Sequence, residues 1–266
     1  MRVLVTVKED EMVDDEFEID GLGISEQYVS YELNEWDDYA VEEAVQLSEA
    51  AEDDEVEVVT ATIGPERSEE TIRQALAKGA DRAVRVWDDD LADADVLDPT
   101  MKAQLLAGAV EEVEPDLVLT GVQGGDDAFG ATGVALAETV DYQWAAVVND
   151  LDLDEAAGVA SVHRELEGGV EELTDVDLPA VLSIQTGINE PRYASLRGIR
   201  QAQSKPLDVY TPDELDIDLA DLGSKLTLTS IAEPESESNT TLFEGDAGEQ
   251  AEQLGDLLED EGVVEG

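Results

Sequence analysis

The strongest local signal in the sequence is residues 116–133, which read Asp116-Leu-Val-Leu-Thr-Gly-Val-Gln-Gly-Gly-Asp-Asp-Ala-Phe-Gly-Ala-Thr-Gly133. A short apolar run leads into a glycine-rich turn, and the turn leads into a helix pattern over 130–140. Glycines at such a junction let backbone amides approach a phosphate, which a helix N-terminus also attracts. The stretch matches neither a P-loop nor a G-x-G-x-x-G fingerprint. Taken alone, it fits a phosphate site and an ordinary glycine-rich loop equally well.

The same alternation of strand and helix patterns extends to both sides of this stretch. Strands are expected at 2–7, 56–62, 83–87, 116–120, 145–148 and 179–184, and helices at 37–50, 68–77, 100–113 and 130–140. An irregular hairpin over 9–33, an antiparallel hairpin over 159–174, a polar linker at 233–241 and a terminal helix at 249–258 complete the pattern. This rhythm predicts an α/β fold with a doubly wound, mostly parallel sheet, an antiparallel hairpin and a C-terminal extension. We expect one domain over 1–206 and the extension over 207–266.

The charge balance narrows the possible partners. The chain has 266 residues, of which 68 are acidic and 14 are Lys or Arg, so its formal charge is −54. Nucleic acid and anionic membranes need a basic patch and are excluded as default partners. Self-repulsion of this size weakens a compact state in dilute salt, and about 1 M salt screens most of it. A salt-rich cytoplasm, as in an extreme halophile, is therefore the expected location.

Residues that are scarce in the sequence exclude several chemistries. There are no cysteines and a single histidine, His163, which excludes disulfides, Cys-ligated zinc, iron–sulfur clusters, thiol nucleophiles and multi-His metal sites. No apolar run approaches the ~20 residues that span a bilayer, and the N-terminus starts as a strand without a signal-peptide pattern. We expect a soluble cytoplasmic protein. A Ser-His-Asp triad would have to use His163, which fits better as a solvated strand residue, and no catalytic set of residues is found.

Three other segments lie at the predicted carboxyl ends of strands, where doubly wound sheets bind ligands. They are 6–8, 63–65 and the turn 34–37, which precedes the first long helix. Together with the glycine-rich stretch they could enclose an adenine nucleotide. Trp36 in that turn fits either this pocket or the core.

A further unusual segment reads Asn189-Glu-Pro-Arg-Tyr-Ala-Ser-Leu-Arg-Gly-Ile199. Its turn places Tyr193, Leu196 and Ile199 among cations that are rare elsewhere in the chain. Apolar anchors in such a setting are typical of a protein-docking element, and we predict a docking loop over 187–206. The alternative is a loop that folds back on its own core.

These motifs together resemble the beta subunit of electron-transfer flavoproteins over nearly the whole chain. The matching stretches are Val3-Leu-Val-Thr-Val-Lys8, Tyr39-Ala-Val-Glu-Glu-Ala44, Gly64-Pro65, residues 71–82, 116–121, 162–169 and 178–181, and Asn189-Glu-Pro-Arg-Tyr-Ala-Ser-Leu196. The resemblance implies an adenine-nucleotide-hydrolase-like sheet in a heterodimer with an alpha subunit. It also implies an electron carrier that is not an enzyme. Its FAD is shared with the alpha subunit and its C-terminal arm packs on that partner.

The resemblance also assigns site residues. For the nucleotide, AMP or a second FAD, it implies contacts from Thr6, Asn34, Glu35, Trp36, Asp37, Ile63, Gly121, Gln123, Gly124, Gly125, Asp126, Phe129, Gly130, Ala131 and Thr132. Trp36 would lie near the flavin, and Arg164 and Glu165 would support the subunit interface. For dehydrogenase docking it implies Asn189, Pro191, Arg192, Tyr193 and the anchor Leu196.

The implied function is transfer of electrons from acyl-CoA or other dehydrogenases, as in fatty acid oxidation, to a membrane quinone oxidoreductase. The Thr, Gln and Pro that many members carry in the phosphate loop are missing from their places in 126–134. AMP and a second FAD therefore both stay open, the latter in an electron-bifurcating complex that oxidises NADH. A stand-alone adenine-nucleotide-binding protein is the remaining alternative.

Overall fold

The computed structural model describes residues 1–51, 56–94, 96–220, 222–233 and 240–263. The chain divides into two compact units, Met1–Ile231 and Ala232–Gly266. The first unit contains the sheet and every segment discussed above for ligand binding. The described residues of the second unit include helix α6 (Ala247–Asp260).

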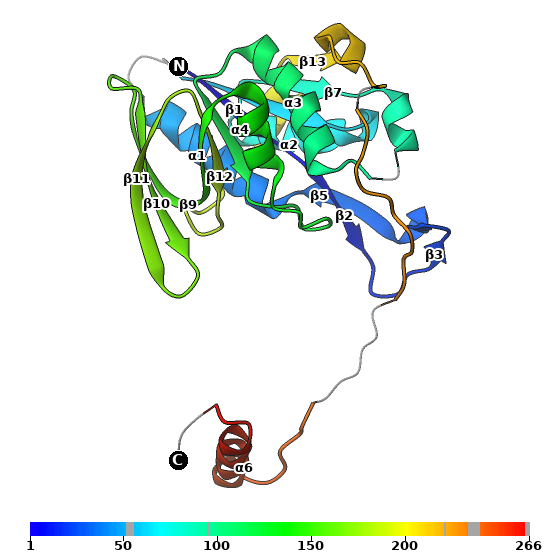
Figure 1. Cartoon of the computed structure of the whole chain (residues 1–266), viewed down its shortest axis with the longest axis vertical. Helices are drawn as coiled ribbons and strands as arrows, with labels where there is room; N and C mark the ends of the chain where they lie inside the picture. Colours follow the sequence, from blue (N-terminus) through cyan, green and yellow to red (C-terminus); the bar gives the residue numbers. More distant parts are fainter. Residues whose placement is uncertain (52–55, 95, 221, 234–239, 264–266) are drawn as a thin grey trace. The chain divides into compact units, whose positions relative to one another are not determined.

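A nine-stranded sheet, in the order β11-β10-β9-β12-β8-β1-β6-β7-β13, organises the first unit (Figure 1). Its strands are β1 (Arg2–Thr6), β6 (Glu57–Ile63), β7 (Arg82–Val86), β8 (Leu117–Gly121), β9 (Gln143–Asp154), β10 (Val159–Leu166), β11 (Val170–Asp177), β12 (Ala180–Ile184) and β13 (Leu207–Tyr210). All neighbouring pairs from β9 to β13 in this order are parallel, and β10 and β11 add an antiparallel extension at one edge. The predicted α/β class and mostly parallel sheet are confirmed.

Helices cover both faces of the sheet, which explains the nearly continuous apolar strands. The helices of this unit are α1 (Glu35–Ala50), α2 (Glu69–Lys78), α3 (Pro99–Val113), α4 (Thr132–Val140) and α5 (Leu196–Ala202). Residues of α1 and α2 pack with Val3 and Val5 in one buried cluster. Residues of α3 and α4 pack with Leu4 in the other. The side chains of β1 thus alternate between two cores.

Short elements complete the first unit. The excursion after β1 forms two antiparallel ribbons, β2 (Glu9–Val13) with β5 (Val29–Leu33) and β3 (Ile19–Asp20) with β4 (Gly23–Ile24), which confirms the hairpin expected over 9–33. Within the part of the chain that the structure describes, 3₁₀ turns lie at Glu26–Tyr28, Glu66–Ser68, Asp89–Asp93 and Pro212–Leu215.

The sheet corrects the expected domain boundary at residue 206. Strand β13, at 207–210, pairs in parallel with β7 and therefore belongs to the sheet. Leu215, Ile217, Leu219 and Leu222 then pack against the core beside α3. The compact unit ends at Ile231. The sequence pattern does not predict β13, because this four-residue edge strand has two exposed residues and lacks the apolar periodicity of the other strands.

Candidate functional site

The sheet has one topological switch point, between β1 and β8. From β1 the chain continues to β6 on one side, whereas β8 lies on the other side. Open α/β sheets bind ligands at the carboxyl ends of the strands at such a point. A pocket lies there. It is lined by residues 6–9 from the end of β1 to the start of β2, Asn34 and Asp37 at the start of α1, Ala61 and Ile63 of β6, Leu97, Lys102 and Leu106 around α3, Thr120–Gly124, Asp127 and Gly130–Thr132.

Two helices begin at this pocket, and neither has a side-chain cap. Asn34 is the N-cap residue of α1, but its side-chain Nδ2 donates to the Gln123 carbonyl at 2.9 Å instead of capping the helix. Ala131 precedes α4 and has no capping group. The free N–H groups and dipoles of two helix N-termini favour an anion.

Two buried polar atoms at the pocket have no hydrogen-bond partner among the described residues. They are Oδ1 of Asn34 and Oγ1 of Thr120. A buried unpaired oxygen costs free energy until a donor reaches it. The Asn34 oxygen suits an exocyclic amino group such as that of adenine. Uncapped helix ends, unpaired acceptors and glycines fit an adenine nucleotide.

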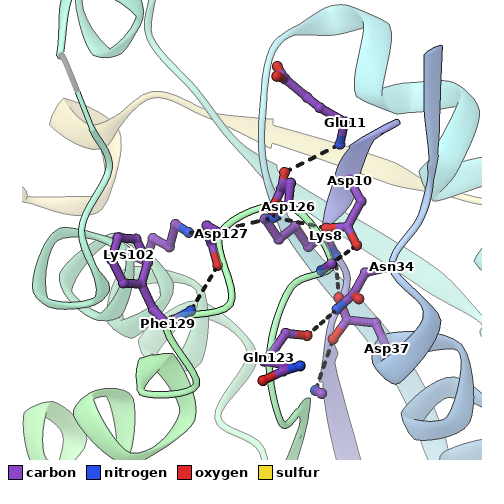
Figure 2. Close-up of polar contacts among 12 residues, drawn as sticks. Lys8, Asp10, Glu11, Asn34, Asp37, Lys102, Gln123, Asp126, Asp127 and Phe129 are labelled. Atoms are coloured by element: carbon purple, nitrogen blue, oxygen red, sulfur yellow. Dashed lines mark hydrogen bonds and ion pairs between the residues drawn. The ribbon is translucent and has the colours of Figure 1, made fainter. Parts of the chain in front are cut away.

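Asp37 joins the two strands at the switch point. Its Oδ2 accepts the Lys8 N–H at 2.7 Å and its Oδ1 accepts the Gly121 N–H at 2.9 Å (Figure 2). Burial raises the pKa of Asp37 to about 7, although these backbone bonds favour the carboxylate. Gly121 has to be a glycine here, because a Cβ would lie 2.6 Å from Asp37 Oδ1 and 2.7 Å from the Cβ of Trp36.

We expect Asp37 to lower the free energy of unfolding as the pH rises from about 4 to 7. Its pKa is about 7 in the folded chain, whereas the ordinary pKa of an aspartate is 3.8. The folded state thus binds the proton more tightly, and that stabilisation disappears as the pH rises, at up to roughly 1.4 kcal/mol per pH unit. Denaturant unfolding at fixed high salt should show a smaller pH slope for Asp37→Asn than for the wild type. The exposed neighbour control Glu35→Gln should keep the wild-type slope, and an unchanged slope in Asp37→Asn would contradict the assignment.

The structure brings ten of the fifteen predicted nucleotide residues to the pocket wall. They are Thr6, Asn34, Asp37, Ile63, Gly121, Gln123, Gly124, Gly130, Ala131 and Thr132. The remaining five, Glu35, Trp36, Gly125, Asp126 and Phe129, lie outside the lining. Trp36 donates its indole N–H to Gln185 Oε1 at 3.1 Å, and the Gly125 N–H is held by Asp10 at 2.7 Å.

Sequence reasoning missed two lysines of the pocket. Lys8 follows β1 and Lys102 lies on α3, and both side chains reach carboxylates of the loop 122–131 (Figure 2). Lys8 lies in the strand-end segment 6–8, and that position is a signal in the sequence that points to the pocket. Lys102 has no local signal, because its place depends on how α3 packs.

The predicted docking segment is anchored on α1 and projects two apolar side chains. Asn189 donates to Glu43 at 2.9 Å and to the Tyr39 carbonyl at 3.1 Å. Arg192 binds Glu42 at 2.7 Å and Glu49 at 2.6 Å. Tyr193 is 98% exposed and Leu196 is 77% exposed. The side chains of Tyr193 and Leu196 therefore do not fold back on the core.

The arginine of this segment is tightly held. The hydrogen bonds that Arg192 donates to Glu49 and Glu42 raise the pKa of Arg192 above its ordinary value. Burial raises the pKa of Glu42, but hydrogen bonds from Arg192 and Gln46 outweigh it and leave the pKa lowered. Pro191 precedes the arginine and is half-buried.

The predicted interface pair lies on the antiparallel extension. Arg164 of β10 faces Glu172 of β11, with 3.6 Å between the charged atoms, and Glu165 is exposed. His163, next to them, lies 3.6 Å from Glu171. None of these three residues lines the pocket at the switch point.

Comparisons with known proteins identify relatives over almost the full chain. A model of the electron transfer flavoprotein domain matches residues 21–215. The chain is 40% identical to electron transfer flavoprotein subunit beta of Methylophilus methylotrophus, over 96% of both chains. It is 37% identical to the Homo sapiens subunit beta, over 88% of this chain and 89% of that one. It is 33% identical to the Bacillus subtilis (strain 168) subunit beta, over 99% of this chain and 100% of that one.

Proposed function

The chain belongs to the electron transfer flavoprotein beta-subunit family, and from this premise we propose that it pairs with an alpha subunit and covers a shared FAD. A protein of this family is an electron carrier and not an enzyme. FAD supplies the redox chemistry when bound. The residues of this chain bind, orient and shield cofactors, and Trp36, Arg164 and Glu165 are proposed to lie toward the alpha subunit and its flavin.

The pocket at the switch point is proposed to bind AMP. What supports this is the unpaired Oδ1 of Asn34 beside two helix N-termini without side-chain caps. The amino group of the base would donate to the buried Oδ1 of Asn34. The phosphate would accept from the N–H groups near Gly130–Thr132 and bind Lys8 and Lys102. Glu35, Gly125 and Phe129 would support the site from outside the lining, and Asp126 would lie beside the phosphate, where it contacts Lys8. A second FAD in this pocket would instead place the chain in a bifurcating complex.

The exposed Tyr193 and Leu196 are proposed to dock dehydrogenases, including acyl-CoA dehydrogenases, which deliver electrons for a membrane quinone oxidoreductase. Asn189 and Arg192 hold the segment rigidly on α1, so little conformational freedom is lost when a partner binds. The exposed Arg197 and Arg200 beside them suit an acidic rim on the partner.

Leu196→Ala should lower the rate of electron acceptance from a dehydrogenase by about tenfold or more, since central apolar anchors carry most of an interface's free energy. Nucleotide and flavin content should not change. The assay follows flavin reduction in the purified heterodimer. Leu22→Ala removes another exposed leucine, far away in the chain, and should leave the rate unchanged. An unaffected rate in Leu196→Ala would disprove the anchor.

The C-terminal unit is proposed to act as an arm that packs on the alpha subunit. Its helix α6 begins with a capping box at Asp246 and carries the exposed Leu254 and Leu257. No helix within the described residues is long and apolar enough to cross a membrane. The charge of −54 supports a salt-rich cytoplasm as the proposed location.

A further inference from the structure

Two lysines of the pocket are held by carboxylates of the protein itself. Lys8 Nζ lies 2.8 Å from Asp10 Oδ1 and 3.7 Å from Asp127 Oδ2, and it also contacts Asp126. Lys102 contacts the same Asp127 from the other side. Figure 2 shows both lysine side chains directed toward the loop that carries the two aspartates. Asp127 therefore bridges cations from two separate segments, the turn after β1 and helix α3.

These ion pairs are shielded from solvent. The side chain of Lys102 is 16% exposed, that of Asp127 is 24% exposed and that of Asp10 is 6% exposed. Burial raises the pKa of Asp127, but Lys102 and Lys8 outweigh it and keep the pKa low. Partly buried pairs are screened less by salt than surface pairs, so they persist in concentrated salt.

The same lysines are well placed for a ligand anion. Lys8, Lys102 and Asp127 all line the pocket, together with the uncapped start of α4. Two lysines face three carboxylates, of Asp10, Asp126 and Asp127, so the cluster already carries an excess negative charge. A phosphate that bound the lysines with all three carboxylates in place would meet like-charge repulsion.

The loop with the two aspartates has the backbone features of a segment that can rearrange. Ala128 has a φ of +48° and Gly130 has a φ of +61°. The left-handed conformation is unfavourable for alanine, so a shift of the loop can relieve it. Gly124 allows the close approach of Lys8, because a Cβ there would lie 2.6 Å from Nζ.

We propose that Asp126 and Asp127 compete with the phosphate of the bound nucleotide for Lys8 and Lys102. Nucleotide binding then exchanges protein carboxylates for a phosphate on the same lysines. The inference rests on the proposed nucleotide site and deepens it. The two lysines recognise the phosphate, and the two aspartates weaken its binding because they occupy the same lysines. The ligand class is a phosphorylated nucleoside, and an unphosphorylated nucleoside should be insensitive to the exchange.

A double-mutant cycle on the purified heterodimer, stripped of nucleotide and kept in high salt, tests the exchange. The probes are AMP and adenosine, and equilibrium dialysis gives their Kd values. Asp127→Asn should tighten AMP binding about tenfold, and Lys102→Met should weaken it about tenfold, as expected for contacts between charged groups. In the Lys102→Met background, the gain from Asp127→Asn should be much smaller. Adenosine binding should change little in any variant.

The control Glu138→Gln removes an exposed carboxylate of α4 and should leave the Kd for AMP unchanged. An equal gain from Asp127→Asn in both backgrounds would mean simple repulsion and would overturn the exchange. Absence of any gain would overturn it as well. If the wild type binds AMP but the variants do not change the Kd as predicted, only the exchange is disproved and the proposed nucleotide site stands. If the wild type binds neither AMP nor adenosine, the proposed nucleotide site falls too. Circular dichroism of each variant checks that it is folded.

Discussion

Gly121→Ala is expected to abolish nucleotide binding and to lower the free energy of unfolding by about 3 kcal/mol, near the upper end for overpacking. Its Cβ would lie 2.6 Å from Asp37 Oδ1, 2.7 Å from the Cβ of Trp36 and 3.0 Å from the Asp37 nitrogen. Backbone and Cβ atoms cannot rotate away, so the start of α1 has to move. That movement breaks the hydrogen bonds that the Gly121 and Lys8 N–H groups donate to the Asp37 carboxylate.

The variant is measured by denaturant unfolding and by the nucleotide that the heterodimer releases on denaturation. Gly223→Ala is the matched control, because a Cβ there meets nothing within 4 Å. Gly223→Ala should change the free energy of unfolding by no more than a few tenths of a kcal/mol. Its nucleotide content should stay close to that of the wild type. A stable Gly121→Ala protein with full nucleotide content would show that the start of α1 does not shape the pocket.

Dilution from about 3 M to about 0.1 M KCl is expected to abolish cooperative thermal unfolding, because the folded chain is lost. With 68 acidic and 14 basic residues, repulsion acts over the whole surface. The Debye length grows from roughly 3 Å at 1 M to roughly 10 Å at 0.1 M, so screening disappears over this range. Fourteen cations, several of them paired in the described ion pairs, cannot compensate.

Circular dichroism melts across the salt series measure this effect. Sucrose in place of KCl is the control, because an uncharged osmolyte favours compact states without screening charge. Sucrose should therefore not restore the cooperative unfolding transition that is lost at low salt. A Tm that does not depend on salt would contradict the electrostatic account and, with it, the proposed salt-rich environment.

The elements at the switch point show what local sequence patterns can predict. Apolar runs such as Val3-Leu4-Val5 predicted buried parallel strands, and the strand ends predicted most of the pocket wall. These predictions succeed because strand burial and chain direction leave few places for the carboxyl ends.

Other features depend on contacts that are distant in the sequence. Lys102 reaches Asp127 only because α3 packs beside α4. Asparagine is a favoured residue at a helix N-cap. The Asn34 side chain nevertheless donates its hydrogen bond to the Gln123 carbonyl, 89 residues away. Strand β13 is short and lies at a sheet edge, and its pairing with β7 stabilises it despite a weak pattern. Tertiary contacts override local preference at each of these positions.

The nucleotides bound to the assembled complex decide whether the pocket between β1 and β8 holds AMP. The chain is co-expressed with its alpha subunit in high salt, the purified heterodimer is denatured, and the released nucleotides are separated and quantified. We predict one FAD and one AMP per heterodimer, with the AMP lost selectively in Gly121→Ala. Two FADs and no AMP would contradict the AMP assignment and place the chain in a bifurcating complex. A complex with FAD but no second nucleotide would contradict the proposed role of the pocket between β1 and β8.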